Sequence, residues 1–182
     1  MAMELRSFWF ALTVKPRHEK AAAHNLRLRG LEEFLPLHAE RRPWSDRVKT
    51  VELPLFPGYV FCRFTYAERL WALNTPGIRS IVGFGNQETP LADAEVEAVQ
   101  KLVSSGMPIS PWPYLRIGDR VQVEHGALEG VRGVIVREKG PWRLVVNVEL
   151  LQRSIAVEID REFLGPCRGL PSTSTCQQQL SC

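Results

Sequence analysis

The chain has 182 residues, of which 45% are hydrophobic and 24% charged, and these values are ordinary for a soluble globular protein with one domain or two small ones. The net charge of +3 is too small to identify a nucleic-acid-binding protein by itself. The apolar run from Phe8 to Val14 is too short for a secretory signal, so we expect a cytoplasmic protein without a membrane segment.

The first hundred residues alternate between strand-like and helix-like segments. Aromatic and branched residues at 8–14 predict a strand, and the Ala, Leu, Lys and Arg residues of 17–29 predict a helix that Gly30 ends. Strands are expected in three later segments and helices in two: strands at 33–37, 54–64 and 78–82, and helices that begin near residues 66 and 93. This order is that of a ferredoxin-like split βαβ domain with one appended helix.

Two features of this half bear on function. The segment 40–52 has no apolar period and is rich in Arg and Lys, which predicts either a basic loop or a long hairpin arm. In the helix after Thr65, Leu70 and Leu73 lie about one turn apart, so both are expected to be buried.

A change of composition near residue 107 predicts a second domain. Three prolines within 107–115 predict a stiff, extended linker, and residues 116–164 alternate apolar and polar residues between Gly and Pro, as in a small all-β barrel. The first domain is then expected at 7–106, and the Ser, Thr and Gln of 165–182 predict a disordered tail.

Motifs for catalysis and metal binding are incomplete. His18-Glu19 begins like a zinc-protease helix, but Ala22 stands where the second histidine would be. Gly83-Phe84-Gly85 lacks the third glycine of a dinucleotide-binding turn, and Cys62 and the three tail cysteines have no zinc-type spacing. We therefore expect no enzymatic activity, no cofactor and no metal site.

Several motifs together resemble the N-terminal domain of NusG-type transcription elongation factors. They are Trp9, Lys15 to Glu19, Phe34 to Pro36, Leu55 to Phe61, Thr75 to Gly77 and Val82 to Gly85. The later segment from Gly118 to Ile135 looks like the KOW motif that follows in such proteins. The similarity covers about residues 7–164 and implies an α+β fold, with a ferredoxin-like domain followed by a small SH3-like KOW barrel.

The resemblance implies a factor that binds RNA polymerase during elongation. In NusG-like proteins an apolar surface of the first domain docks on the clamp helices of the largest polymerase subunit and favours processive transcription. Phe56 and Tyr59 match the family positions that line this surface, and Trp9, Phe61 and Leu73 are supporting candidates. For Trp9 and Phe61, packing in the core of the sheet is the favoured explanation, whereas the docking role is favoured for Phe56 and Tyr59.

The resemblance also places Lys15, Arg17, His18 and Lys20 near upstream DNA, where the non-template strand is exposed. Attraction of phosphates by such a patch is physically reasonable, and a solvated helix face is the alternative.

In the KOW loop, Ala127 and Leu128 stand where the family usually has Pro and Phe, so the implied partners of this loop, the termination factor Rho and a ribosomal protein, are expectations only. Together with this departure, the basic segment 40–50 and the run Leu55 to Tyr59 look closer to a specialised, operon-directed antiterminator of the RfaH, LoaP or UpxY type than to the housekeeping protein.

A rival hypothesis is an RNA-binding KOW module of ribosomal type, against which stands the neutral charge of residues 116–164. A monomer is expected. In some specialised relatives the two domains pack together, and the sequence leaves open whether they do so here.

Overall fold

We describe a computed structural model of the chain, which covers residues 6–43, 48–85, 87–112, 119–136, 141–160 and 163–166. The first domain contains a four-stranded antiparallel sheet with the strand order β2-β5-β1-β6. Its elements are β1 (Phe8–Val14), α1 (Glu19–Leu28), β2 (Glu32–Phe34), β5 (Tyr59–Phe64), η1 (Tyr66–Glu68), α2 (Arg69–Leu73) and β6 (Ile78–Ile81). This topology confirms the ferredoxin-like prediction.

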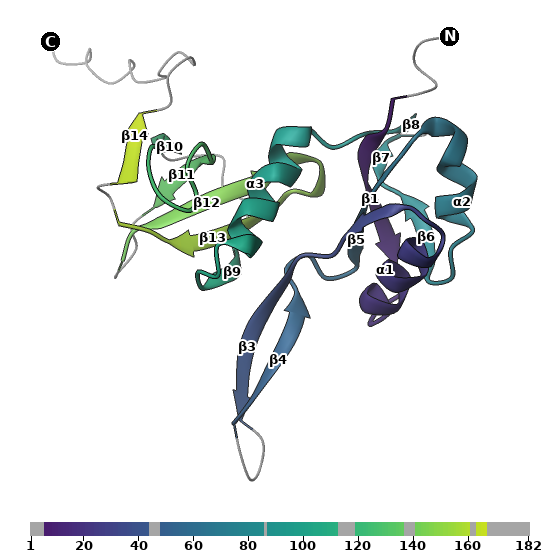
Figure 1. The fold of residues 1–182 in the computed structure, drawn as a ribbon, viewed down its shortest axis with the longest axis horizontal. Helices are drawn as coiled ribbons and strands as arrows, with labels where there is room; N and C mark the ends of the chain where they lie inside the picture. Colours follow the sequence, from purple (N-terminus) through teal and green to yellow (C-terminus); the bar gives the residue numbers. More distant parts are fainter. Residues whose placement is uncertain are drawn as a thin grey trace, which may run out of the picture.

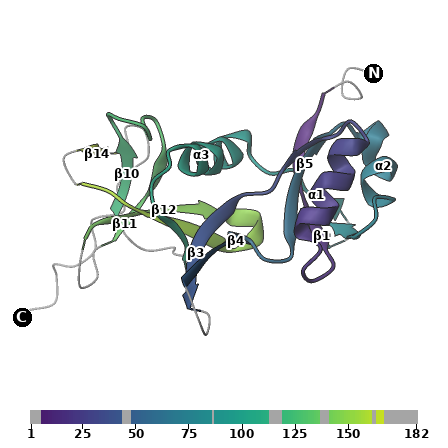
Figure 2. The ribbon, with the colours of Figure 1, turned by 60° about the horizontal axis from the view of Figure 1, so that its bottom comes forward.

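The two central strands, β1 and β5, bury large side chains on both of their faces. They pair from Phe8 with Phe64 to Thr13 with Tyr59, and alternate residues point to opposite sides. On one side, the rings of Phe10 and Phe64 stack with centroids 4.5 Å apart in a core that includes Leu26 of α1. Figure 2 shows α1 and α2 side by side against this side of the sheet.

The short helix α2 differs from the prediction. Its first turn, η1, is a 3-10 helix, and this changes which residues face the sheet. Ala72 is fully buried and Leu73 packs beside it, whereas Leu70 is 60% exposed. The prediction that Leu70 is buried was therefore wrong.

The basic segment forms a hairpin arm. Strands β3 (Leu37–Pro43) and β4 (Val48–Pro54) pair only with each other, and most of their side chains are exposed. Figure 1 shows the arm extending away from both domains. A further short hairpin, β7 (Gly83–Phe84) with β8 (Gln87–Glu88), follows β6.

Helix α3 (Asp93–Ser104) ends the first domain and is amphipathic. Val96, Val99 and Leu102 recur at helical spacing and are buried. The helix lies against β12 (Arg143–Val148) of the second domain (Figure 1), and it also contacts β1 of the first domain. It is therefore a bridge between the two domains.

The second domain is a six-stranded antiparallel sheet in the order β14-β10-β11-β12-β13-β9. Besides β12 and the turn η2 (Glu149–Leu151), its elements are β9 (Ile109–Trp112), β10 (Asp119–Val123), β11 (Arg132–Val136), β13 (Arg153–Glu158) and β14 (Leu164–Pro166). Five of these strands follow the order of a small SH3-like barrel, in agreement with the predicted fold class.

The sixth strand, β9, comes from the segment predicted to be a linker. The tail was predicted to begin at residue 165, but Gly165 and Pro166 belong to β14 and pair with β10, so that boundary was wrong. The segment 113–118 and the chain beyond residue 166 lie outside the described residues.

Candidate functional site

Four of the aromatic residues predicted to bind a partner lie on the side of the sheet opposite α1 and α2. Trp9, Phe56 and Phe61 are between 1% and 4% exposed, and Tyr59 is half-buried beside them. The ring of Phe61 meets that of Phe56 edge-on, with centroids 5.4 Å apart. We call these four residues the aromatic face.

Leu73 is not part of the aromatic face. It packs against the cluster between the sheet and α1, on the opposite side from Phe61. The resemblance gave Leu73 as a supporting candidate, but α2 places it on the other side of the sheet.

The turn that carries Phe56 and Tyr59 is fixed by two hydrogen bonds through Gly58. The Gly58 N–H donates to Glu19 Oε1 at 2.9 Å, and the Val14 N–H donates to the Gly58 carbonyl at 2.9 Å. Gly58 has φ +87°, a conformation that favours glycine. Glu19 is only 8% exposed, so its carboxylate is part of the support of the aromatic face.

The supporting role of Glu19 was missed in the sequence, where the residue was considered only within an incomplete metal motif and within the motif Lys15 to Glu19 of the family resemblance. Its partner Gly58 lies 39 residues further along the chain, so no local sequence pattern indicates that the two residues are in contact. Only the tertiary structure brings the two segments together.

The aromatic face is covered by the second domain. A single apolar cluster contains Trp9, Phe56 and Phe61 of the first domain together with Leu151 and Ile155 of the second. The guanidinium of Arg153 lies 5.8 Å from the centroid of the Tyr59 ring, within the range of a cation–π contact. In this arrangement a partner cannot reach the aromatic face.

The edge of this contact contains a cavity of about 270 Å³. On one side it is lined by Leu55 and Tyr59, and on the other by residues 151–154 and the end of β9. Residues of the turn η2 therefore face the turn that carries Phe56 and Tyr59.

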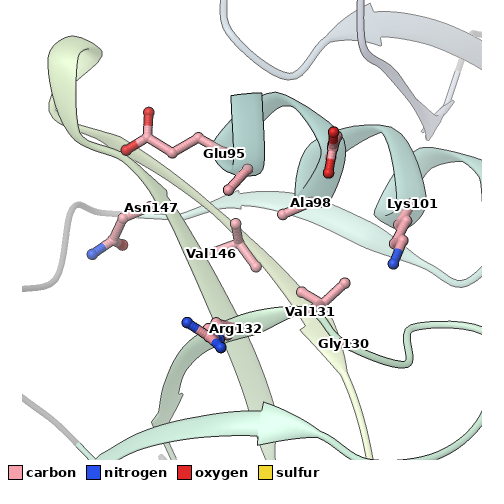
Figure 3. A pocket seen from close by; sticks show the side chains of 10 residues that line it. Glu95, Ala98, Lys101, Gly130, Val131, Arg132, Val146 and Asn147 are labelled. Carbon is pink, nitrogen blue, oxygen red and sulfur yellow. The ribbon is translucent and has the colours of Figure 1, made fainter. Parts of the chain in front are cut away.

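Helix α3 makes a second contact between the domains, which surrounds a cavity of about 340 Å³ (Figure 3). The Glu149 N–H donates to Glu95 Oε1 at 3.2 Å, and Lys101 Nζ donates to the Glu129 carbonyl at 3.0 Å. Burial raises the pKa of Glu95 above its ordinary value, although the hydrogen bond from Glu149 acts in the opposite direction. Relative to the unfolded chain, protonation of Glu95 therefore favours the folded structure, and this contribution is lost as the pH rises through the raised pKa.

In the predicted partner-binding loop of the second domain, this contact buries one of the two predicted residues and leaves the other exposed. Ala127 is exposed, whereas Leu128 is 2% exposed within the shared cluster. Since Lys101 also binds the next carbonyl, at Glu129, helix α3 covers part of the loop.

The predicted nucleic-acid-binding residues Lys15, Arg17, His18 and Lys20 are all exposed around the start of α1. Lys20 Nζ lies 3.3 Å from Glu52 Oε2, which links this basic patch to the base of the hairpin arm. Among the described residues, no carboxylate forms an ion pair with Lys15 or Arg17. The structure thus brings the four residues together on an accessible surface.

Other candidate chemistry is sparse in the described part of the chain. No three His, Cys, Asp or Glu side chains gather there as a metal site would require. Burial raises the pKa of Cys62 to about 12, which keeps this thiol protonated and unreactive. None of the helices in the same residues is long and apolar enough to cross a membrane.

The fold and these surfaces define a two-domain protein in which a ferredoxin-like domain precedes a KOW-like barrel. The chain belongs to the NusG family, because the family model described as "Transcription termination factor nusG" matches residues 7–100. A transcription termination/antitermination protein NusG from Lactococcus lactis is 30% identical over 148 residues, which are 78% of each chain. The corresponding protein from Helicobacter pylori strain 26695 is 24% identical and covers 75% of this chain and 80% of its own.

A solved structure with a similar fold is described as "Domain interaction in Thermotoga maritima NusG". Its TM-score is 0.54 at 20% identity, over 90% of this chain and 99% of that chain. The sequence-based assignment to NusG-like factors is therefore confirmed, and the family is one of transcription termination and antitermination factors.

Proposed function

We propose that this protein binds RNA polymerase during elongation by docking its aromatic face on the clamp helices of the largest subunit. The observation that carries the proposal is the gathering of Trp9, Phe56, Tyr59 and Phe61 on one side of the sheet. Clusters of large aromatic side chains are the usual energetic centre of protein interfaces. The protein would act by binding and not by making or breaking bonds, and it would favour processive transcription.

Docking requires that the second domain leave the aromatic face. Phe56 is 1% exposed, so the same side chain cannot contact the second domain and the polymerase together. The apparent affinity for polymerase then falls with the fraction of molecules that are closed. A gated factor of this kind suits an operon-directed antiterminator, which the altered loop at Ala127 and Leu128 also favours.

The basic patch is proposed to contact DNA that emerges near the docked domain. Lys15, Arg17, His18 and Lys20 are exposed and close together, and phosphate contacts need only accessible positive charge. The non-template strand is the expected ligand, since the resemblance places this surface beside it.

Replacement of Tyr59 by alanine tests whether the aromatic face is the docking surface. We compare Tyr59→Ala with Tyr66→Ala, the same change at a tyrosine that is 45% exposed on η1. Both changes are made in a chain that also carries Leu151→Asp, so that the aromatic face is uncovered from the start. Tyr59→Ala is expected to lower polymerase capture at least tenfold, because an interface aromatic commonly contributes about 1.4 kcal/mol or more.

Capture is measured with purified RNA polymerase by surface binding, and circular dichroism confirms that each variant is folded. Equal capture by the Tyr59 and Tyr66 variants would show that docking does not use the aromatic face.

Replacement of Lys15 and Arg17 tests whether the basic patch binds DNA. The double change to alanine is expected to lower the slope of log affinity against log salt by roughly 1.4 for single-stranded DNA, because each lost phosphate contact removes about 0.7. The control removes two arginines of the second domain, Arg120 and Arg132, and so makes the same change in charge. Fluorescence anisotropy over a salt series measures the slope, and identical slopes for the two double variants would contradict the assignment.

A further inference from the structure

We infer that β9 is a releasable strap whose pairing with β13 sets how far the two domains can separate. β9 is antiparallel to β13, with Ile109 opposite Val157 and Trp112 opposite Ser154. It lies at the edge of the second domain's sheet, although its residues directly follow the first domain (Figure 1). The inference concerns the two domains alone and does not depend on the identity of a partner.

The pairing determines the length of the free connection. While β9 is paired, only residues 105–108 lie between the end of α3 and the second sheet. Four residues span at most about 14 Å, which keeps α3 next to β12. When β9 is released, its four residues join the free connection, and residues 105–112 alone can span about 28 Å.

The pairing is weak for a sheet strand. β9 has only four residues, and Pro111 has no N–H with which to donate to a ladder. Ser110 and Pro111 are exposed, while Ile109 and Trp112 are half-buried. By contrast, β13 pairs with its other neighbour, β12, through six residues.

One side chain contact holds the end of the strap. The Arg143 guanidinium lies 5.0 Å from the centroid of the Trp112 ring, in a cation–π geometry. Trp112 also lines the cavity of about 270 Å³ that Leu55 and Tyr59 border. The Trp112 end of the strap therefore lies at the point where the aromatic face meets the second domain.

Trp112→Ala tests the strap, with Trp71→Ala as the matched control because Trp71 is 60% exposed on α2. Loss of the cation–π contact and of the half-buried ring is expected to raise amide exchange in β9 and along β13 about tenfold over the control. Small-angle scattering on the same full-length samples is expected to show a larger radius of gyration for Trp112→Ala only.

A second variant acts in the opposite direction. Pro111→Val supplies an N–H and a β-branched side chain, so exchange in β9 is expected to slow and the radius of gyration to stay at or below that of the wild type. The inference is overturned if Trp112→Ala exchanges like Trp71→Ala. It is also overturned if β9 is released in Trp112→Ala without any increase in the radius of gyration, since the strap would then not limit domain separation.

Discussion

Leu151→Asp is expected to separate the two domains while each of them stays folded. Leu151 is 8% exposed in the turn η2 and lines the cavity opposite Leu55 and Tyr59. The change removes an apolar contact and places a short carboxylate against the first domain. Together these effects disfavour closure by on the order of 3 kcal/mol, which is about a hundredfold in the ratio of closed to open molecules.

The measurement is a comparison of amide chemical shifts in the full chain with those of each domain alone, supported by small-angle scattering. Leu28→Asp is the matched control, because Leu28 is 72% exposed on α1 and the change in charge is the same. If Leu151→Asp keeps the chemical shifts of the closed chain, the interface of the two domains does not depend on this turn.

Phe61→Ala is expected to cause the largest loss of stability among single changes to the aromatic face. Phe61 is 1% exposed and lies between Phe34, at a centroid distance of 6.0 Å, and Phe56, at 5.4 Å. Truncation of a buried phenylalanine leaves a cavity and costs about 3–5 kcal/mol. Chemical denaturation monitored by circular dichroism should show this loss in the transition of the first domain.

Phe84→Ala provides the reference for Phe61→Ala. Its ring is 70% exposed on the short β7–β8 hairpin, so the same truncation should change the free energy of unfolding by less than about 0.5 kcal/mol. Similar losses for the two variants would mean that Phe61 is not part of the shared core.

Local patterns predicted most of the first domain. The strand β1 lies at its expected bounds and the Ala- and Leu-rich α1 lies within two residues of its own, whereas β5 begins at Tyr59, five residues after the expected start at 54. The missed strand β9 contains a proline, which reads locally as a linker. Its partner β13 lies more than 40 residues further along the chain, so only long-range pairing makes it a strand.

The sequence indicated which aromatic residues lie together in the candidate site, but it did not indicate that the second domain covers them. Phe56 and Tyr59 do lie together, but Phe56 is covered because the second domain contributes Leu151 and Ile155 to the same cluster. No local pattern in either domain reports how the two faces fit. Leu73 was assigned to the wrong side of the sheet, since the 3-10 turn before α2 changes which side chains of this helix face the sheet.

The central claim is that one surface binds the second domain in the free protein and RNA polymerase in the complex. A photo-crosslinking amino acid at position 59 tests it most directly, because Tyr59 faces residues 151–154. In the free protein, irradiation should give a crosslink within the chain to residues 151–154. With saturating polymerase that product should disappear and a crosslink to the largest subunit should replace it. An internal crosslink that persists unchanged when polymerase is bound would contradict the account.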